Sequence, residues 1–343
     1  MLGRRRLGRT GLEVSTIGFG GIPIMRVSRE VAERAVRTAV ELGINFIDTA
    51  RGYGDSERKI GAAIRGLEPR PILASKSPKR DRQGILEDFD ETLRNLEQDR
   101  IEIYQLHCVN KLEEYERAMG KDGAYRGLED LKTAGRIDFI GITSHNLEII
   151  KRAILSDMFD TVQILFNFLE PEAHDEIIPL AQKHDVGIIA MKPLAGGCIE
   201  DYKLGLKFVT SHDGVVAIPG MADEQEVRLN IEAVTDRKGL SEDELRMIED
   251  LRSRIGRTYC RRCDYCQPCP NGIPISFALH IENIRKRIGD EMMRSDAYRD
   301  LLAKVEACVQ CGKCEERCPF DLPVRDLIAQ ARSILSEVLS SRG

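Results

Sequence analysis

The sequence has no tryptophan, only 5% of its 343 residues are aromatic, and its net charge is only −5. No apolar run approaches the roughly 20 residues that span a bilayer. No basic tail or stripe stands out either, so we expect neither a membrane protein nor a nucleic-acid-binding protein. The basic start, residues 1–6, is not followed by the apolar stretch of a signal peptide, and we therefore expect a cytoplasmic protein.

Cysteine is unevenly distributed along the chain. Eight of the ten cysteines fall between Cys260 and Cys318, whereas Cys108 and Cys198 stand alone. In a reducing compartment disulfides are rare, and cysteines at fixed short spacings usually bind metal. The distribution therefore predicts a metal-binding segment at the C-terminal end.

From Ser15 to about Asp236 one pattern recurs, in which a short apolar run is followed by turn residues and an amphipathic helical stretch. Continuous apolar runs are typical of strands buried on both faces of a parallel sheet. Eight such units in roughly 220 residues predict an α/β fold, a (β/α)₈ barrel. A doubly wound open sheet is the alternative, and the absence of a glycine-rich turn after the first strand disfavours it. The expected strands are 15–20, 44–48, 71–76, 101–107, 137–143, 161–165, 186–191 and 215–219.

The pattern changes after residue 236. Ser241 and Glu244 have the spacing of a capping box that begins a helix. Two cysteine-rich segments follow, separated by helical stretches, and a last amphipathic helix is expected from Val324. We predict two domains: a barrel over 1–240, and a linker helix with a small α-helical ferredoxin-like domain over 241–343.

Four residues are expected at the mouth of the barrel, where the chemistry of such folds is carried out. Asp48, Lys76 and His107 each end an expected strand, and Tyr53 follows one of these strands by a short loop. An ammonium beside a phenol favours the phenolate, and a carboxylate can hold that ammonium in place. A neutral histidine can donate a hydrogen bond to a carbonyl oxygen. The set predicts proton delivery to a carbonyl group that receives hydride.

These residues lie in motifs that resemble the aldo/keto reductase family over roughly residues 5–235. The motifs are Asp48–Glu57, Ala74–Lys76, Tyr104–His107, Gly141–Asn146, Val162–Gln163 and the opening Leu7–Ser15. The resemblance implies that Tyr53 is the general acid, that Lys76 and Asp48 tune it, and that His107 orients the carbonyl. The alternative is that the ionisable residues form only barrel-end salt bridges. This is disfavoured because all four residues occur along the chain in the same order as in the family.

The resemblance also implies a nicotinamide cofactor. Ser144, or Thr143 beside it, and Gln163 would bind the nicotinamide carboxamide, and Asn230 falls where the family contacts adenine. Where the family usually stacks a tyrosine on the nicotinamide, this chain has Met191, which offers no flat π face. Lys192, with Leu194 just after it, would lie close to the pyrophosphate.

A second departure concerns the basic residues with which the family binds a 2′-phosphate. This chain has Gly220, Met221 and Glu226 at those positions, with Asp223 and Glu224 nearby. A carboxylate repels a 2′-phosphate and can accept a hydrogen bond from a free ribose hydroxyl. We therefore expect an NAD(P) cofactor, with NAD favoured over NADP.

The cysteine motifs carry the strongest local signal. Cys260-x2-Cys263-x2-Cys266-x2-Cys269-Pro precedes Cys308-x2-Cys311-x2-Cys314-x3-Cys318-Pro, and the second has the bacterial ferredoxin spacing. In two-cluster ferredoxins the fourth cysteine of a motif serves the other cluster. We therefore expect two 4Fe–4S clusters, one on Cys260, Cys263, Cys266 and Cys318, the other on Cys269, Cys308, Cys311 and Cys314. Two structural zinc sites are the alternative, although zinc modules usually use cysteine pairs.

The two-part layout resembles a subgroup of the aldo/keto reductases with a ferredoxin-like tail, and three functions stay open. The first is a nicotinamide-dependent reductase of a small-molecule carbonyl, or oxidant of an alcohol. The second is an electron-transfer oxidoreductase with a flavin such as FMN, because hydride carries two electrons and each cluster carries one. The third is a redox-sensing barrel without catalysis. We expect a monomer, with a redox partner protein where the clusters exchange electrons.

Overall fold

The computed structural model describes residues 2–235 and 239–340. The chain divides into two compact units, one of residues 1–195 and 199–240 and the other of residues 196–198 and 241–343. We propose that the domain boundary lies at residue 240. Asp236, where the repeated pattern was expected to end, lies outside the described residues.

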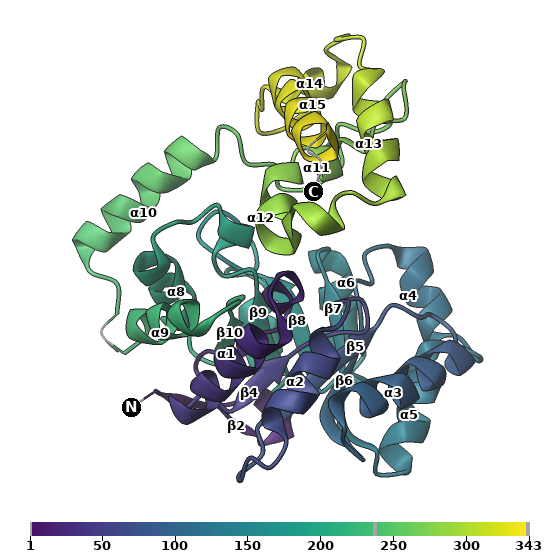
Figure 1. Cartoon of the computed structure of the whole chain (residues 1–343), viewed down its shortest axis with the longest axis vertical. Coiled ribbons are helices and arrows are strands. Elements are labelled where there is room, and N and C mark those ends of the chain that lie inside the picture. Colours follow the sequence, from purple (N-terminus) through teal and green to yellow (C-terminus); the bar gives the residue numbers. More distant parts are fainter. Residues whose placement is uncertain (1, 236–238, 341–343) are drawn as a thin grey trace. The chain divides into compact units, whose positions relative to one another are not determined.

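The first unit is built on an eight-stranded parallel sheet whose strands are hydrogen-bonded in sequence order (Figure 1). Parallel bridges from Ile17 to Ala217 and from Gly20 to Gly220 join the first strand to the last and close the sheet. The predicted (β/α)₈ barrel is confirmed. Its strands are β3 (Phe19–Gly20), β4 (Phe46–Asp48), β5 (Ile72–Ser77), β6 (Ile101–Leu106), β7 (Ile137–Ser144), β8 (Thr161–Leu165), β9 (Gly187–Met191) and β10 (Val215–Ile218).

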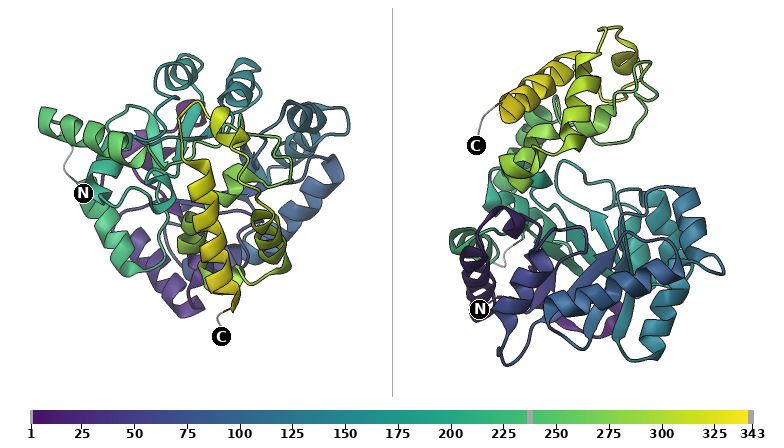
Figure 2. Two further views of the ribbon diagram at one scale, coloured as in Figure 1. Left: turned by 90° about the horizontal axis from the view of Figure 1, so that it is seen from above. Right: turned by 45° about the vertical axis from the view of Figure 1, so that its right-hand side comes forward.

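Amphipathic helices form an outer layer around these strands (Figure 2). In α1, the hydroxyl of Ser28 accepts from the Val31 amide, and Gly43 follows the helix with a φ of 102° that favours glycine. The buried face of α1 carries alanines and Val36, which face the strands. The helices are α1 (Arg29–Glu41), α2 (Ser56–Ile64), α3 (Arg82–Leu96), α4 (Leu112–Met119), α5 (Ala124–Thr133), α6 (Leu147–Leu155), α7 (Ile177–Lys183), α8 (Tyr202–Thr210) and α9 (Glu224–Ala233).

An N-terminal hairpin was not predicted. β1 (Arg4–Arg6) pairs antiparallel with β2 (Glu13–Ser15), so the expected strand over 15–20 is wrong at its start, and the barrel strand begins at Phe19. The physical reason is burial: Leu7 and Val14 of the hairpin are fully buried in one cluster with Phe46 and other residues of the barrel strands. The hairpin therefore covers apolar side chains inside the barrel that would otherwise meet water.

The second unit is helical. The capping box of Ser241 and Glu244 is present at the start of α10 (Glu242–Ile255), and the last helix, α15 (Val324–Ser340), begins where it was predicted. α15 packs against α12 (Ile281–Met292) and α13 (Asp296–Glu306), and these lie around it in both views of Figure 2. Its buried residues, among them Leu335 and Val338, form one apolar core with residues of α12 and α13. Two short helices, α11 (Ile275–Ala278) and α14 (Lys313–Glu316), complete the unit.

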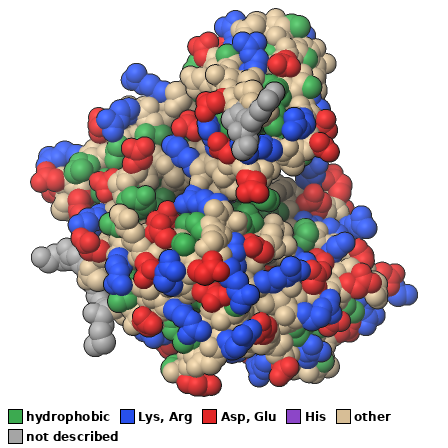
Figure 3. Space-filling model, viewed as in Figure 1, with side chains coloured by type: hydrophobic (Ala, Val, Ile, Leu, Met, Phe, Trp, Pro, Cys, Tyr) green, Lys and Arg blue, Asp and Glu red, His purple; other side chains and the backbone are tan. Residues whose placement is uncertain are grey.

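The surface mixes charges of both signs, and Figure 3 shows acidic and basic side chains interspersed on the face in view. None of the helices in the described parts of the chain has both the length and the apolar character needed to cross a membrane.

Candidate functional site

A buried ion pair lies at the end of the barrel where the strands finish. Asp48 is the last residue of β4, and Lys76 lies in the neighbouring strand β5. The Lys76 ammonium donates to Asp48 Oδ1 at 2.5 Å and to the carbonyl of Thr49 at 2.7 Å. Both side chains are almost completely buried, and Lys76 Nζ lies 5.1 Å from the centre of the Tyr53 ring. The charge of Lys76 is therefore held beside the phenol.

His107 completes this group. It follows β6, and its ring meets the Tyr53 ring edge-on, with the centres 5.6 Å apart. Burial, together with the positive charges of Lys76 and Arg80, lowers the pKa of His107 to about 3 from its ordinary 6.5. The imidazole is therefore neutral at physiological pH. The structure thus brings together all four residues that the sequence placed at the barrel mouth.

The Asp48 carboxyl is also in contact with a residue that the sequence did not single out. Burial raises its pKa, while Lys76 and Gln105 act in the opposite direction. Gln105, in β6, places its amide nitrogen 3.4 Å from Asp48 Oδ2 and 3.4 Å from Oε1 of Gln163. Gln105 lies within the Tyr104–His107 motif, two positions before His107, but nothing in the sequence showed what its side chain would contact.

A second polar cluster anchors the loop that carries Tyr53. Glu57, at the start of α2, is 1% exposed, and Arg51 pairs with its Oε2 at 2.6 Å. Its Oε1 accepts hydrogen bonds from Ser75 and Thr92, each at 2.8 Å. Arg51 and Glu57 flank Tyr53 in sequence, so this cluster fixes both ends of the loop. Glu57 belongs to the first family motif, but nothing in the sequence showed that Ser75 and Thr92 would meet it.

Thr143 and Ser144, the predicted carboxamide contacts, hold the segment after His107. The Thr143 hydroxyl accepts from the Cys108 amide at 2.8 Å. The Ser144 hydroxyl donates to Asn110 Oδ1 at 3.2 Å, and the same oxygen accepts from the backbone amide of His145 at 2.8 Å. Asn110 was missed from the sequence, and it joins the ends of β6 and β7.

The predicted adenine contact has an unusual environment. Asn230, in α9, is 1% exposed, and within the described residues its side-chain oxygen has no hydrogen-bond partner. A buried acceptor without a donor is destabilising by about 1–3 kcal/mol. A ligand that brings an N–H group would remove this penalty.

The residues near the expected 2′-phosphate position are occupied by contacts within the protein. Glu226 Oε1 accepts from Arg26 at 2.9 Å, and its Oε2 accepts from the Ala222 amide at 2.6 Å. Gly220 lies against Pro23, whose Cγ would be 2.6 Å from a Cβ at this position. The half-buried Met191 ends β9, and Lys192, Pro193 and Leu194 follow it.

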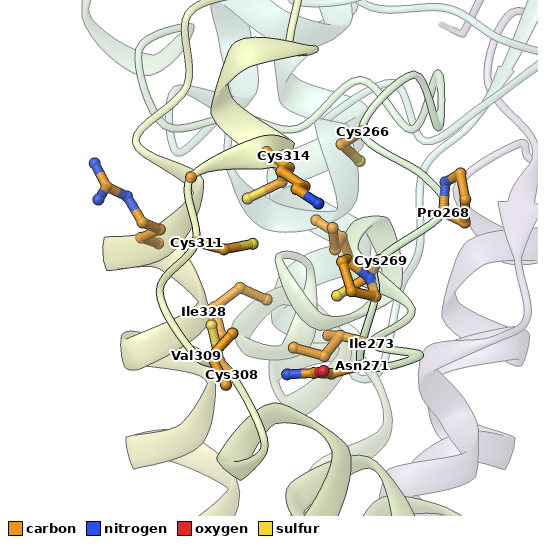
Figure 4. A pocket seen from close by; sticks show the side chains of 15 residues that line it. Cys266, Pro268, Cys269, Asn271, Ile273, Cys308, Val309, Cys311, Cys314 and Ile328 are labelled. Carbon is orange, nitrogen blue, oxygen red and sulfur yellow. The ribbon is translucent and has the colours of Figure 1, made fainter.

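Eight cysteines of the second unit line two pockets. Cys260, Cys263, Cys266 and Cys318 line one, together with apolar residues such as Leu279, Phe320 and Leu322. The other is lined by Cys269, Cys308, Cys311 and Cys314, with Ile273 and Ile328 in its wall and Cys266 at its border. Figure 4 shows this second set around one space. Among the described residues, no group of three or more His, Cys, Asp or Glu side chains has the geometry to hold a single metal ion.

The walls of both pockets suit an iron–sulfur cluster. One pocket is lined by four thiols and the other by five, in each case from two distant segments, and apolar side chains form part of both walls. The backbone amide of Arg262 donates to the sulfur of Cys260 at 3.4 Å. Such bonds stabilise a thiolate and are among the features that set cluster potentials.

Comparison with known proteins gives matches for both units. Residues 16–205 match the Aldo/keto reductase family, and residues 259–322 match a 4Fe-4S dicluster domain. L-galactose dehydrogenase from Arabidopsis thaliana is 28% identical over 292 residues, which cover 70% of this chain and 90% of that protein.

Solved structures resemble the barrel. An aldo-keto reductase from Bacillus halodurans, in its holo form, aligns with a TM-score of 0.64 and 25% identity, over 73% of this chain and 96% of that one. An aldo/keto reductase from Klebsiella pneumoniae, in complex with NADP and acetate, aligns with a TM-score of 0.63 and 25% identity, over 73% and 95% of the two chains.

Proposed function

Because this chain belongs to the aldo/keto reductase family and has a C-terminal 4Fe-4S dicluster domain, we propose that it is a nicotinamide-dependent oxidoreductase that reduces a carbonyl group or oxidises the corresponding alcohol. One observation carries the proposal: the buried Lys76–Asp48 pair lies against Tyr53, and a neutral His107 completes the group.

Each residue of this group has a defined task. Tyr53 gives its proton to the carbonyl oxygen, and the Lys76 ammonium beside the ring stabilises the phenolate that is left. Asp48 holds Lys76 in that position through a direct ion pair. His107, being neutral, donates a hydrogen bond to the substrate oxygen and stabilises the negative charge that develops on it. A reduced nicotinamide bound beside these residues would supply the hydride.

Several side chains of the barrel fit a nicotinamide cofactor. The unpartnered oxygen of Asn230 can accept a hydrogen bond from the adenine amino group. Ser144 and Thr143 lie on β7, the strand next to β6, and Gln163 lies on β8 beside them, where the carboxamide would bind. Met191, Lys192, Leu194 and Gly220 would line the rest of the site. We propose NAD rather than NADP, because the Glu226 carboxylate would face a 2′-phosphate.

This preference can be tested at Glu226. We expect Glu226→Gln to raise the ratio of kcat/KM for NADPH to that for NADH by about tenfold, because it removes a negative charge and leaves Arg26 in place. Glu224→Gln is the matched control, since Glu224 lies in the same helix and pairs with Arg34 at 3.1 Å. Steady-state kinetics with both cofactors gives the ratios. An equal change in the two variants, or a wild type that already prefers NADPH, would contradict the assignment.

For the second unit we propose two 4Fe–4S clusters, one in each cysteine-lined pocket. The two sets of thiols, Cys260, Cys263, Cys266 and Cys318 in one pocket and Cys269, Cys308, Cys311 and Cys314 in the other, support this allocation. Hydride carries two electrons and each cluster accepts one. Direct exchange between the nicotinamide and the clusters therefore needs a flavin or another adapter.

An anaerobic absorption spectrum with iron and sulfide assays tests the whole proposal. We expect iron, sulfide and oxidation of NADH by a carbonyl substrate. Bleaching of the cluster absorption by NADH alone would favour a flavin-linked electron-transfer enzyme, with bound FMN released on denaturation. Zinc in place of iron would exclude the cluster proposal, and the absence of nicotinamide binding would exclude the reductase.

The lowered pKa of His107 has a consequence for the pH dependence of the reaction. Its imidazole stays neutral as the pH falls through 6.5 and gains a proton only near 3. We therefore expect the rate of carbonyl reduction to show no decline between about pH 7.5 and 5 that is due to His107. Initial rates at saturating cofactor across this range provide the measurement. An acidic limb with an apparent pKa near 6.5 that disappears in His107→Gln would show that His107 gains its proton in this range, contrary to the prediction.

A further inference from the structure

The fully buried side chain of Gln105 joins the two halves of the active site. It extends into the barrel from β6, and its exposed fraction is 0%. Its amide nitrogen has two hydrogens, and two acceptors lie 3.4 Å from it, Asp48 Oδ2 and Gln163 Oε1. Asp48 belongs to the proton-donating group, whereas Gln163 belongs to the proposed cofactor site. Gln105 is therefore the direct polar connection between them.

The chemistry of the partners fixes the orientation of both amides. An ionised carboxylate only accepts hydrogen bonds, so the nitrogen of Gln105 must face Asp48. The second hydrogen on that nitrogen then needs an acceptor, and this requires the oxygen of Gln163 to face Gln105. The NH₂ group of Gln163 is left as its remaining donor. This is the group required to bind the carbonyl oxygen of a carboxamide.

The bond to Asp48 has a second effect. Lys76 donates to Asp48 Oδ1, and Gln105 donates to Oδ2, the other oxygen of this completely buried carboxyl group. Donation to the ionised form lowers the pKa of Asp48 against the effect of burial. Gln105 thereby helps to keep Asp48 charged, and a charged Asp48 keeps Lys76 in position.

We propose that Gln105 is a positioning residue that ties the Asp48 carboxylate to the Gln163 amide, so that the proton donor and the cofactor carboxamide are aligned by one hydrogen-bonded chain. This rests on the proposed nicotinamide-dependent reaction. Gly141 on β7 makes room for the arrangement: a Cβ at that position would lie 2.7 Å from Cγ and 3.0 Å from Oε1 of Gln105.

A double-mutant cycle with the full-length, cluster-loaded protein tests the proposal. Gln105→Met keeps the length of the side chain and removes its hydrogen bonds. We expect it to weaken NADH binding by roughly 5- to 10-fold, as Gln163→Met does, and the double variant to bind no more weakly than Gln163→Met alone. We also expect Gln105→Met, unlike Gln163→Met, to change the pH profile of kcat, because Gln105 is hydrogen-bonded to Asp48 and Gln163 is not. NADH fluorescence titrations and pH–rate profiles provide both readouts.

The outcomes separate this proposal from the proposed function. Additive losses in the double variant, or a folded Gln105→Met with unchanged NADH binding and unchanged pH profile, overturn the role of Gln105. If Gln105→Met does not fold, Gln105→Asn serves instead: it is one methylene shorter and cannot span both acceptors, so wild-type behaviour again overturns the role. A wild type that binds no nicotinamide contradicts the proposed function itself.

Discussion

Replacing Tyr53 by phenylalanine is expected to lower the rate of carbonyl reduction by about 10²- to 10⁴-fold, the range for loss of a positioned proton donor. The variant removes only the hydroxyl group and keeps the contacts of the ring with the His107 imidazole and the Lys76 ammonium. We therefore expect the dissociation constant of the nicotinamide and the iron content to stay close to the wild-type values. Single-turnover reduction under anaerobic conditions measures the chemical step directly.

Tyr125→Phe is the matched control for this experiment. Tyr125 lies in α5, and its hydroxyl donates to the carbonyl of Met158 at 2.8 Å, away from the four site residues. Its loss should decrease the stability of the barrel by about 1 kcal/mol and leave the rate unchanged. Near-wild-type turnover by Tyr53→Phe would exclude Tyr53 as the acid. It would favour the alternative in which the barrel senses a redox state without catalysing a reaction.

The architecture of the barrel was largely predictable because strands buried on both faces are continuous apolar runs. Segments such as Gly187–Met191 could be assigned before any tertiary contact was known. The ends of these runs also placed Asp48, Lys76 and His107 on one rim, since parallel strands finish at the same edge of a barrel. The N-terminal hairpin could not be assigned in this way. Leu7 and Val14 are buried by residues of distant strands, and no local periodicity reflects that burial.

The polar residues that support the site were not predictable for a related reason. Glu57 is only one of many acidic residues in the sequence, and its role depends on Arg51, Ser75 and Thr92, which reach it from three other segments. Gln105 depends in the same way on Asp48 and Gln163, each more than 50 residues away. Both residues lie within the family motifs, Glu57 in Asp48–Glu57 and Gln105 in Tyr104–His107. The motifs do not show which distant side chains these two residues contact.

The assignment of the cysteines to the two clusters can be tested by substituting single cysteines, and these substitutions should change the second unit more than any other. Cys318 follows the three cysteines of the second motif in sequence, yet it lines the same pocket as Cys260, Cys263 and Cys266. We expect Cys318→Ala to remove one cluster and to halve the iron and sulfide content of the protein. Cys198→Ala, at a cysteine outside both motifs, is the control and should retain all of the iron.

Double variants then decide which cysteines share a cluster. If Cys318 and Cys260 hold the same cluster, Cys318→Ala with Cys260→Ala retains the half of the iron that either single variant retains, because only one cluster is lost. Cys318→Ala with Cys308→Ala should lose nearly all of it, since Cys308 lines the other pocket. The alternative is a cluster built from the second motif alone, on Cys308, Cys311, Cys314 and Cys318. In that case the Cys318/Cys308 double variant would retain half of the iron, and the Cys318/Cys260 double variant would lose nearly all of it. Iron analysis of anaerobically purified protein distinguishes the two arrangements without any need to resolve the clusters spectroscopically.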